Sequence, residues 1–125
     1  MSAGLRVLIV EDNRDTADML GEIVHDWGHE TRVAYDGVAG LQVADQFQPQ
    51  VVLLDIGLPK LPGYDVARRL RERDWGQDAL VVAVTGWGED SDRRKSEAAG
   101  IDHHLVKPIN TDFLEGLLSD YKPAD

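Results

Sequence analysis

The sequence predicts a parallel α/β fold, a sheet of parallel strands covered by helices on both faces. Short apolar runs rich in β-branched residues alternate five times with segments of helical periodicity. The third run, VVLL at residues 51–54, is uninterrupted, which is typical of a central strand buried on both faces. Four of the five runs end on an acidic, basic or hydroxyl side chain, as expected where strand ends form a site.

The first strand and the first helix have clear boundaries. Residues 5–10 (LRVLIV) form an apolar run typical of a strand, and this run ends directly on Glu11 and Asp12. Residues 13–27 carry apolar side chains at three- and four-residue spacing, and Gly28 follows as a stop. The segment is therefore predicted to be an amphipathic helix.

The second and third strand–helix units repeat this pattern. Residues 31–35 predict a strand and residues 38–47 a helix. The third strand ends on Asp55, and a loop containing Pro and Gly leads from it into a helix predicted over residues 64–74. Four arginines of this helix are expected to face water: Arg68, Arg69, Arg71 and Arg73.

The last two units complete the alternation. Residues 79–84 (ALVVAV) predict a buried strand that ends on Thr85. Residues 102–106 predict a fifth strand that ends on Lys107, and residues 112–121 a final amphipathic helix.

The fourth helix is predicted over residues 89–99 and differs from the others. Its apolar face is thin, with Ala98 and Ala99 as its clearly apolar residues, so it is expected to be the least firmly packed helix. Trp87 precedes it, two residues beyond Thr85, and is expected to lie beside the strand ends.

Together these elements predict a flavodoxin-like (βα)5 fold, a five-stranded parallel sheet in the order 2-1-3-4-5 with helices on both faces. The length of 125 residues, 42% of them hydrophobic, fits one domain over residues 1–125 with a core at about residues 5–121.

Composition excludes several classes of function. The net charge of -10 disfavours nucleic acid and anionic membranes as partners. The apolar runs are far shorter than a membrane helix, and the start of the sequence lacks the apolar stretch of a signal peptide. With no cysteine, the fold needs neither disulfides nor thiolate metal sites, and a cytoplasmic location is expected.

The strand ends predict one site. In the order 2-1-3-4-5, the first, third, fourth and fifth strands are contiguous, and their carboxyl ends meet at one edge of the sheet. We therefore expect the polar residues at those four ends to converge: Glu11, Asp12, Asp55, Thr85 and Lys107.

Such a cluster indicates phosphoryl chemistry. Three crowded carboxylates repel one another, and a hard cation with oxygen ligands holds them together, so Mg²⁺ is the predicted metal. Mg²⁺, the Lys107 ammonium and the Thr85 hydroxyl would neutralise and bind phosphoryl oxygens. Asp55 is the natural nucleophile and would form an aspartyl phosphate.

With these residues, the chain resembles a response-regulator receiver domain of two-component signalling, of the chemotaxis-regulator type. The resemblance covers essentially the whole chain. It rests on spacing as well as identity, since Thr85 lies thirty and Lys107 fifty-two positions after Asp55. The matching motifs are Glu11-Asp12, Asp55 with Pro59 and Gly63, Thr85-Gly86, and Lys107-Pro108.

The resemblance implies a role for each residue. Asp55 would accept phosphoryl from a phosphohistidine. Asp12, Asp55 and the Gly57 carbonyl would bind Mg²⁺, with Glu11 acting through water. Thr85 and Lys107 would contact the phosphoryl oxygens. Thr85 would also move its loop on phosphorylation, which the family couples to an aromatic residue three positions before the lysine. His104 occupies that position here, so it is the predicted partner of Thr85 in the switch.

The resemblance also implies a function and partners. The protein would be a phosphoacceptor regulator, not an enzyme, which catalyses its own phosphorylation and dephosphorylation and changes its binding to a downstream protein. A histidine kinase or phosphotransfer protein would be the other partner, docking near Arg14, Asp18 and Met19 together with Pro108-Ile109.

Three alternatives stay open at this point. The chain could be a receiver module of a hybrid histidine kinase that passes phosphate to a phosphotransfer protein, as the segments HHLVKP and TGWGED suggest. A flavin-binding flavodoxin-like protein is disfavoured, because Glu11 and Asp12 would repel a phosphate after the first strand. A dehalogenase-like Mg²⁺-dependent phosphatase is disfavoured, because Gly57 stands where that family has a second Asp.

Overall fold

The computed structural model describes residues 4–86 and 93–122 and confirms the predicted fold. Five strands form one parallel sheet in the order β2-β1-β3-β4-β5. The strands are Arg6–Val10 (β1), Glu30–Ala34 (β2), Val51–Asp55 (β3), Leu80–Thr85 (β4) and His103–Val106 (β5). The helices are Arg14–Asp26 (α1), Gly37–Phe47 (α2), Gly63–Arg71 (α3), Arg93–Ala99 (α4) and Thr111–Asp120 (α5), with a 3-10 turn at Asp74–Gly76 (η1).

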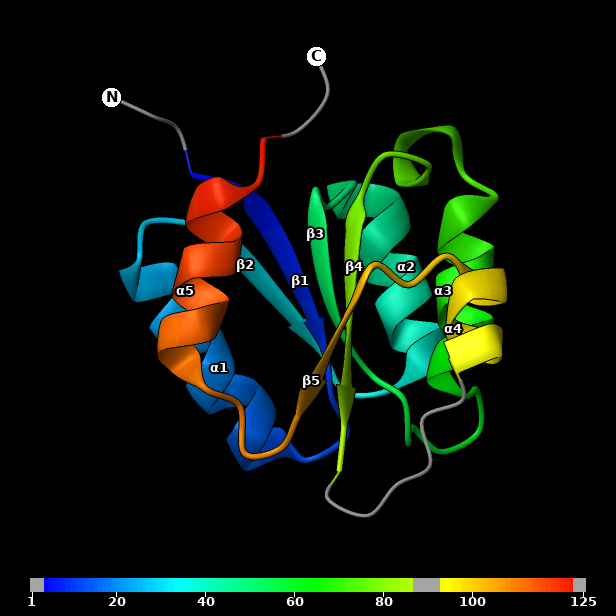
Figure 1. Ribbon diagram of the computed structural model, residues 1–125, viewed down its shortest axis with the longest axis horizontal. Helices are drawn as coiled ribbons and strands as arrows, with labels where there is room; N and C mark the ends of the chain where they lie inside the picture. Colours follow the sequence, from blue (N-terminus) through cyan, green and yellow to red (C-terminus); the bar gives the residue numbers. More distant parts are fainter. Residues whose placement is uncertain (1–3, 87–92, 123–125) are drawn as a thin grey trace.

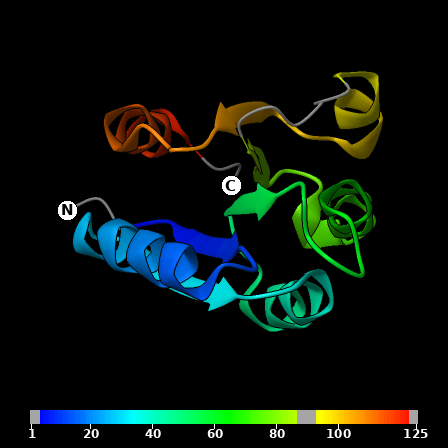
Figure 2. The same cartoon turned by 90° about the horizontal axis from the view of Figure 1, so that it is seen from below.

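The molecule has three layers. Helices α1 and α5 cover one face of the sheet, and α2, α3 and α4 cover the other (Figure 1). The view turned by 90° shows the sheet between these two groups of helices (Figure 2). All strands run in the same direction, so their carboxyl ends share one edge of the sheet.

Two apolar cores hold the layers together, because successive side chains of a strand point to opposite faces. In β1, Leu8 and Val10 pack on the side of α2 and α3, while Val7 and Ile9 pack on the side of α1 and α5. Every residue of β3 is buried, which explains its continuous apolar sequence.

The third helix ends earlier than predicted. It stops at Arg71, and η1 follows where the periodicity predicts helix up to residue 74. The expectation that Arg71 faces water is wrong: its side chain is 20% exposed and donates to several backbone carbonyls. By contrast, Arg68 and Arg69 are exposed as predicted.

The fourth helix agrees only in part. Residues 89–92 of its predicted range, and Trp87, lie outside the described residues. Ala99 is buried as expected, but Ala98 is exposed, and the side chain buried with Ala99 is Ser96. Within the residues described, no helix combines the length and the apolarity needed to cross a membrane.

Candidate functional site

The site is built where β1, β3, β4 and β5 end. Glu11 follows β1 and stays in register with the sheet, because its N–H donates to the carbonyl of Ala34 at 3.0 Å. Asp55 is the last residue of β3, and Thr85 is the last residue of β4. Their side chains are almost fully buried, whereas Asp12 is exposed.

Three carboxylates converge at this edge. The possible ligand oxygens of Glu11, Asp12 and Asp55 all lie within 4.8 Å of one another. Asn13 continues the site into α1: its N–H donates to Glu11 Oε2 at 3.0 Å, and its Oδ1 caps the helix by accepting from the N–H of Thr16. The start of α1 therefore fixes the orientation of the buried glutamate.

Lys107 connects two of these carboxylates. Its Nζ lies 2.5 Å from Glu11 Oε1 and 3.3 Å from Asp55 Oδ2, and a third of its side chain is exposed. Burial lowers the pKa of Lys107, but the hydrogen bond from its ammonium to Glu11 and the charge of Asp55 outweigh burial and raise that pKa above its ordinary value. The ammonium therefore stays charged.

Glu11 carries the largest electrostatic perturbation of the site. Burial, together with the neighbouring Asp55 and Asp12, raises the pKa of Glu11 to about 7, although Lys107 and the N–H of Asn13 act in the opposite direction. A proton or a cation is therefore needed near this group to offset the carboxylate repulsion.

The loop after β3 holds Asp55 in place. The N–H of Gly57 donates to Asp55 Oδ1 at 2.8 Å. The first residue of α3 lies directly against the strand end, since a Cβ on Gly63 would come within 2.5 Å of the Asp55 carbonyl oxygen. Only a glycine fits this close approach without a backbone shift.

Two predicted site residues contact β5 and not the carboxylates. Thr85 Oγ1 lies 3.5 Å from the carbonyl of Leu105, and the N–H of Lys107 donates to the Thr85 carbonyl at 2.8 Å. His104 lies outside the carboxylate cluster and contacts α4, where its Nε2 is 2.6 Å from the buried Ser96 Oγ. Their roles in a switch, and that of the Gly57 carbonyl as a metal ligand, stay predictions.

Ser96 is the contact that sequence reasoning missed. The only available signal was its three-residue spacing from Ala99, which places both on one face of α4. A serine on an otherwise polar helix gave no reason to expect a buried hydrogen bond to a histidine.

The donor set fits a hard divalent cation. The three converging groups are carboxylates, and carboxylate oxygens are the ligands that Mg²⁺ takes in proteins. The raised pKa of Glu11 is a second sign of fit, because it reports negative charge that Lys107 alone does not compensate. The cluster is typical of a Mg²⁺-dependent aspartate phosphorylation site.

Comparison with known sequences gives a consistent family. Residues 7–119 match the family described as response regulator receiver domain. The polar-differentiation response regulator DivK of Brucella anthropi is 30% identical over 114 residues, covering 90% of this chain and 93% of DivK. The DNA-binding dual master transcriptional regulator RpaA of Synechocystis sp. is 32% identical over 107 residues, and the match covers 86% of this chain but only 44% of RpaA.

Solved structures give the same fold. The chemotaxis protein CheY4 of Vibrio cholerae superposes with a TM-score of 0.85 at 25% identity, covering 94% of this chain and 98% of CheY4. The receiver domain of the sensor histidine kinase PA1611 of Pseudomonas aeruginosa has a TM-score of 0.82 at 27% identity, covering 94% and 96%. That structure has a magnesium ion coordinated in its active-site cleft.

Proposed function

Because this chain belongs to the response regulator receiver domain family, we propose that it is a signalling switch that accepts a phosphoryl group on Asp55 from the phosphohistidine of a histidine kinase. The observation that carries the proposal is the convergence of Glu11, Asp12 and Asp55 with the Lys107 ammonium between two of them. The protein acts as a phosphoacceptor, and the phosphorylated form changes its binding to a downstream protein.

The transfer uses Asp55 as the nucleophile. A carboxylate oxygen of Asp55 attacks phosphorus, the bond from phosphorus to the histidine nitrogen breaks, and an acyl phosphate forms. The Gly57 N–H and the Lys107 ammonium fix the two carboxylate oxygens before the attack. Lys107 supplies positive charge to the phosphoryl oxygens.

Mg²⁺ completes the proposed site. Asp12, Asp55 and the Gly57 carbonyl would hold it, and Glu11 would act through water. When bound, the ion neutralises charge on the phosphoryl oxygens. The proposal is supported by the carboxylate cluster and by the similar receiver domain that contains magnesium.

The switch follows from the positions of Thr85 and His104. The Thr85 hydroxyl is held by the β5 carbonyl of Leu105 at the limit of hydrogen-bond distance, so a phosphoryl oxygen is a competitive acceptor. A shift of Thr85 changes its contacts with β5, where His104 holds α4 through Ser96.

A second form of this function is favoured by one comparison. The similar receiver domain of PA1611 is part of a sensor histidine kinase, so this chain could serve as the receiver module of a hybrid kinase and pass phosphate to a phosphotransfer protein. The two forms differ in the direction of the second step. Loss of phosphate from Asp55 to a histidine of a phosphotransfer protein, measured with purified components, supports the hybrid form.

The test of the common step is direct. We expect incubation with Mg²⁺ and an acyl phosphate to add one phosphoryl group, seen in the intact mass, and expect chelation of Mg²⁺ to prevent it. The matched control is Asp55→Asn, which keeps the shape of the side chain but removes the nucleophile. An equal gain of mass in Asp55→Asn, or no gain in the parent protein, contradicts the assignment of Asp55.

A further inference from the structure

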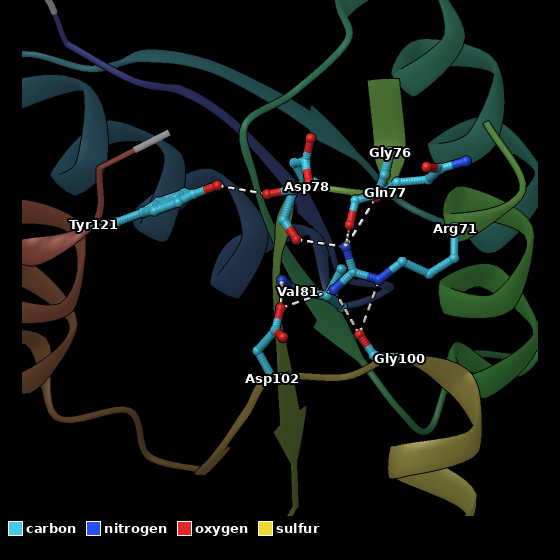
Figure 3. Close-up of polar contacts among 9 residues, drawn as sticks. Arg71, Gly76, Gln77, Asp78, Val81, Gly100, Asp102 and Tyr121 are labelled. Carbon is cyan, nitrogen blue, oxygen red and sulfur yellow. Dashed lines mark hydrogen bonds and ion pairs between the residues drawn. The ribbon is translucent and has the colours of Figure 1, made fainter. Parts of the chain in front are cut away.

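Arg71, the last residue of α3, joins three segments of the chain (Figure 3). Its Nη1 donates to the carbonyls of Gly76, Gln77 and Ala79 at 2.8, 3.1 and 2.6 Å. Its Nε and Nη2 donate to the carbonyl of Gly100 at 3.0 and 2.6 Å. One guanidinium thus fixes the chain leading into β4 and the residue directly after α4.

Asp102 extends this arrangement to the sheet. Its Oδ2 accepts from Arg71 Nη2 at 2.8 Å and from the N–H of Val81 at 2.9 Å, and its own N–H donates to the Val81 carbonyl at 2.8 Å. The connection from α4 to β5 is therefore bound to α3 by an ion pair and to β4 by two hydrogen bonds (Figure 3).

The geometry at Gly100 is specific to this contact. Gly100 has a φ of +81°, and a Cβ there would lie 2.8 Å from Arg71 Nε. A larger residue would be strained by its backbone conformation and would displace the guanidinium. The end of α4 and the Arg71 side chain therefore fit each other closely.

The rest of α4 is held weakly. The helix has seven residues, and its buried side chains in the described part are Ser96 and Ala99. Toward β5, Ser96 meets the ring of His104 at 2.6 Å. Strong polar contacts thus fix Gly100 and Asp102, directly beyond the helix, while few fix the helix itself, which the sequence joins to Thr85 through residues 86–92.

We propose that Arg71 is a positioning residue that anchors the C-terminal end of α4, so that the helix pivots about Gly100 when Asp55 is phosphorylated. The anchor confines movement to the end of α4 nearer to Thr85 in the sequence and to the contact between Ser96 and His104. This inference rests on the proposed phosphorylation, and it assigns a structural cause to the direction of the response.

Amide hydrogen exchange and NMR can test the anchor. The reporters are the N–H groups of Ile101, which donates to Ser96, and of Asp102, which donates to Val81; Ile9 and Leu53 report on the core. We expect Arg71→Met to lower protection at both reporters by roughly tenfold or more, with less than about threefold change at the core amides. Arg69→Met, an exposed control on the same helix, should leave all four unchanged.

The pivot is tested by the same measurement with Mg²⁺ and an acyl phosphate. In the parent protein, phosphorylation should shift the His104 ring signals and leave protection of Ile101 and Asp102 unchanged. In Arg71→Met, phosphorylation should also lower protection at these two amides. Loss of their protection on phosphorylation of the parent protein overturns the pivot. An equal loss at reporters and core in Arg71→Met overturns the anchor.

Two further variants cover the case in which Arg71→Met does not fold. Arg71→Lys keeps the charge but loses the planar fork, and Asp102→Asn keeps an acceptor but loses the ion pair. Both should lower protection at Ile101 and Asp102 while the core stays protected, and no change in either variant overturns the anchor. Intact mass separates the two levels: a parent protein that gains no phosphoryl group fails the proposed function, whereas the unphosphorylated samples judge the anchor by themselves.

Discussion

Lys107 decides the charge state of the site. Its ammonium contacts Glu11 and Asp55 together, yet the pKa of Glu11 still rises to about 7, because burial and two neighbouring carboxylates outweigh one cation. The folded protein without metal therefore binds a proton at Glu11 more tightly than the unfolded chain, where the ordinary pKa is 4.5.

This difference predicts a pH dependence of stability. Because the folded-state pKa is raised, the contribution of Glu11 to the free energy of unfolding is full below pH 4.5 and is lost as the pH rises to about 7. The loss is on the order of 2 kcal/mol after screening at the open side of the site. Urea unfolding of the metal-free protein from pH 4.5 to 8 measures it, with Glu11→Gln as control. A slope that persists unchanged in Glu11→Gln contradicts the assignment.

The same proton should compete with Mg²⁺. Metal ligands must be deprotonated, so we expect Mg²⁺ affinity to rise with pH up to about 7 and then level off. Calorimetry in two buffers of different ionisation enthalpy should show proton release below pH 7. Equal proton release in Glu11→Gln would assign the proton to another group.

Single residues also mark the limit of what the sequence predicts. The position of Asp55 was predictable because it follows a buried apolar run, and strand ends converge by topology alone. The role of Arg71 was not, because its acceptors Gly100 and Asp102 lie about thirty residues away and meet it only after folding.

At the scale of elements, the contact of α3 with the end of β3 sets the geometry around Asp55. α3 begins at Gly63 without a side-chain cap, and its backbone lies against Asp55 and Ile56. The helix thereby closes the loop that carries Gly57. A change of side chain at this one position should therefore affect both stability and phosphorylation.

Two glycine substitutions test this contact. Gly63→Ala places a Cβ 2.5 Å from the Asp55 carbonyl oxygen, so we expect a loss of about 1–3 kcal/mol in the free energy of unfolding and slower phosphorylation. In Gly116→Ala, on α5, the Cβ meets nothing within 4 Å, so a gain of up to about 1 kcal/mol is expected. Equal effects of the two changes, measured by urea unfolding, would exclude a close contact at Gly63.

The boundaries of α3 and the inner face of α4 show why elements are only partly predictable. Helical periodicity continues to residue 74, but Arg71 donates to the carbonyls of η1 and the following residues, which favours a turn there. In α4, a tertiary contact with His104 buries Ser96, and no pattern of apolar residues reports such a contact. Strand order and layers, by contrast, follow from the alternation itself.

At the scale of the whole molecule, a net charge of -10 repels itself across the surface. Added salt should therefore raise stability, because it shortens the screening length from about 30 Å at 0.01 M to about 8 Å at 0.15 M. The helix dipoles act locally on the same charges, so the position of an acid along α1 should decide the sign of its effect.

A matched pair of variants separates the two effects. Asp15 lies in the first turn of α1 and Asp26 is its last residue, and both are exposed. We expect Asp26→Asn to raise and Asp15→Asn to lower the free energy of unfolding by about 0.3–1 kcal/mol each at low salt. Both variants remove one negative charge, so a rise in both, measured by urea unfolding, would show that net charge outweighs the dipole.

The two groups of helices on either side of the sheet give the protein an electrical polarity. By formal charge, α1 holds four acids and one arginine and α5 three acids, whereas α3 and α4 each hold three cations and one acid. The molecule therefore has a dipole moment that runs across its sheet (Figure 2). An approaching charged protein is rotated before it touches the surface, and a basic one meets α1 and α5 first.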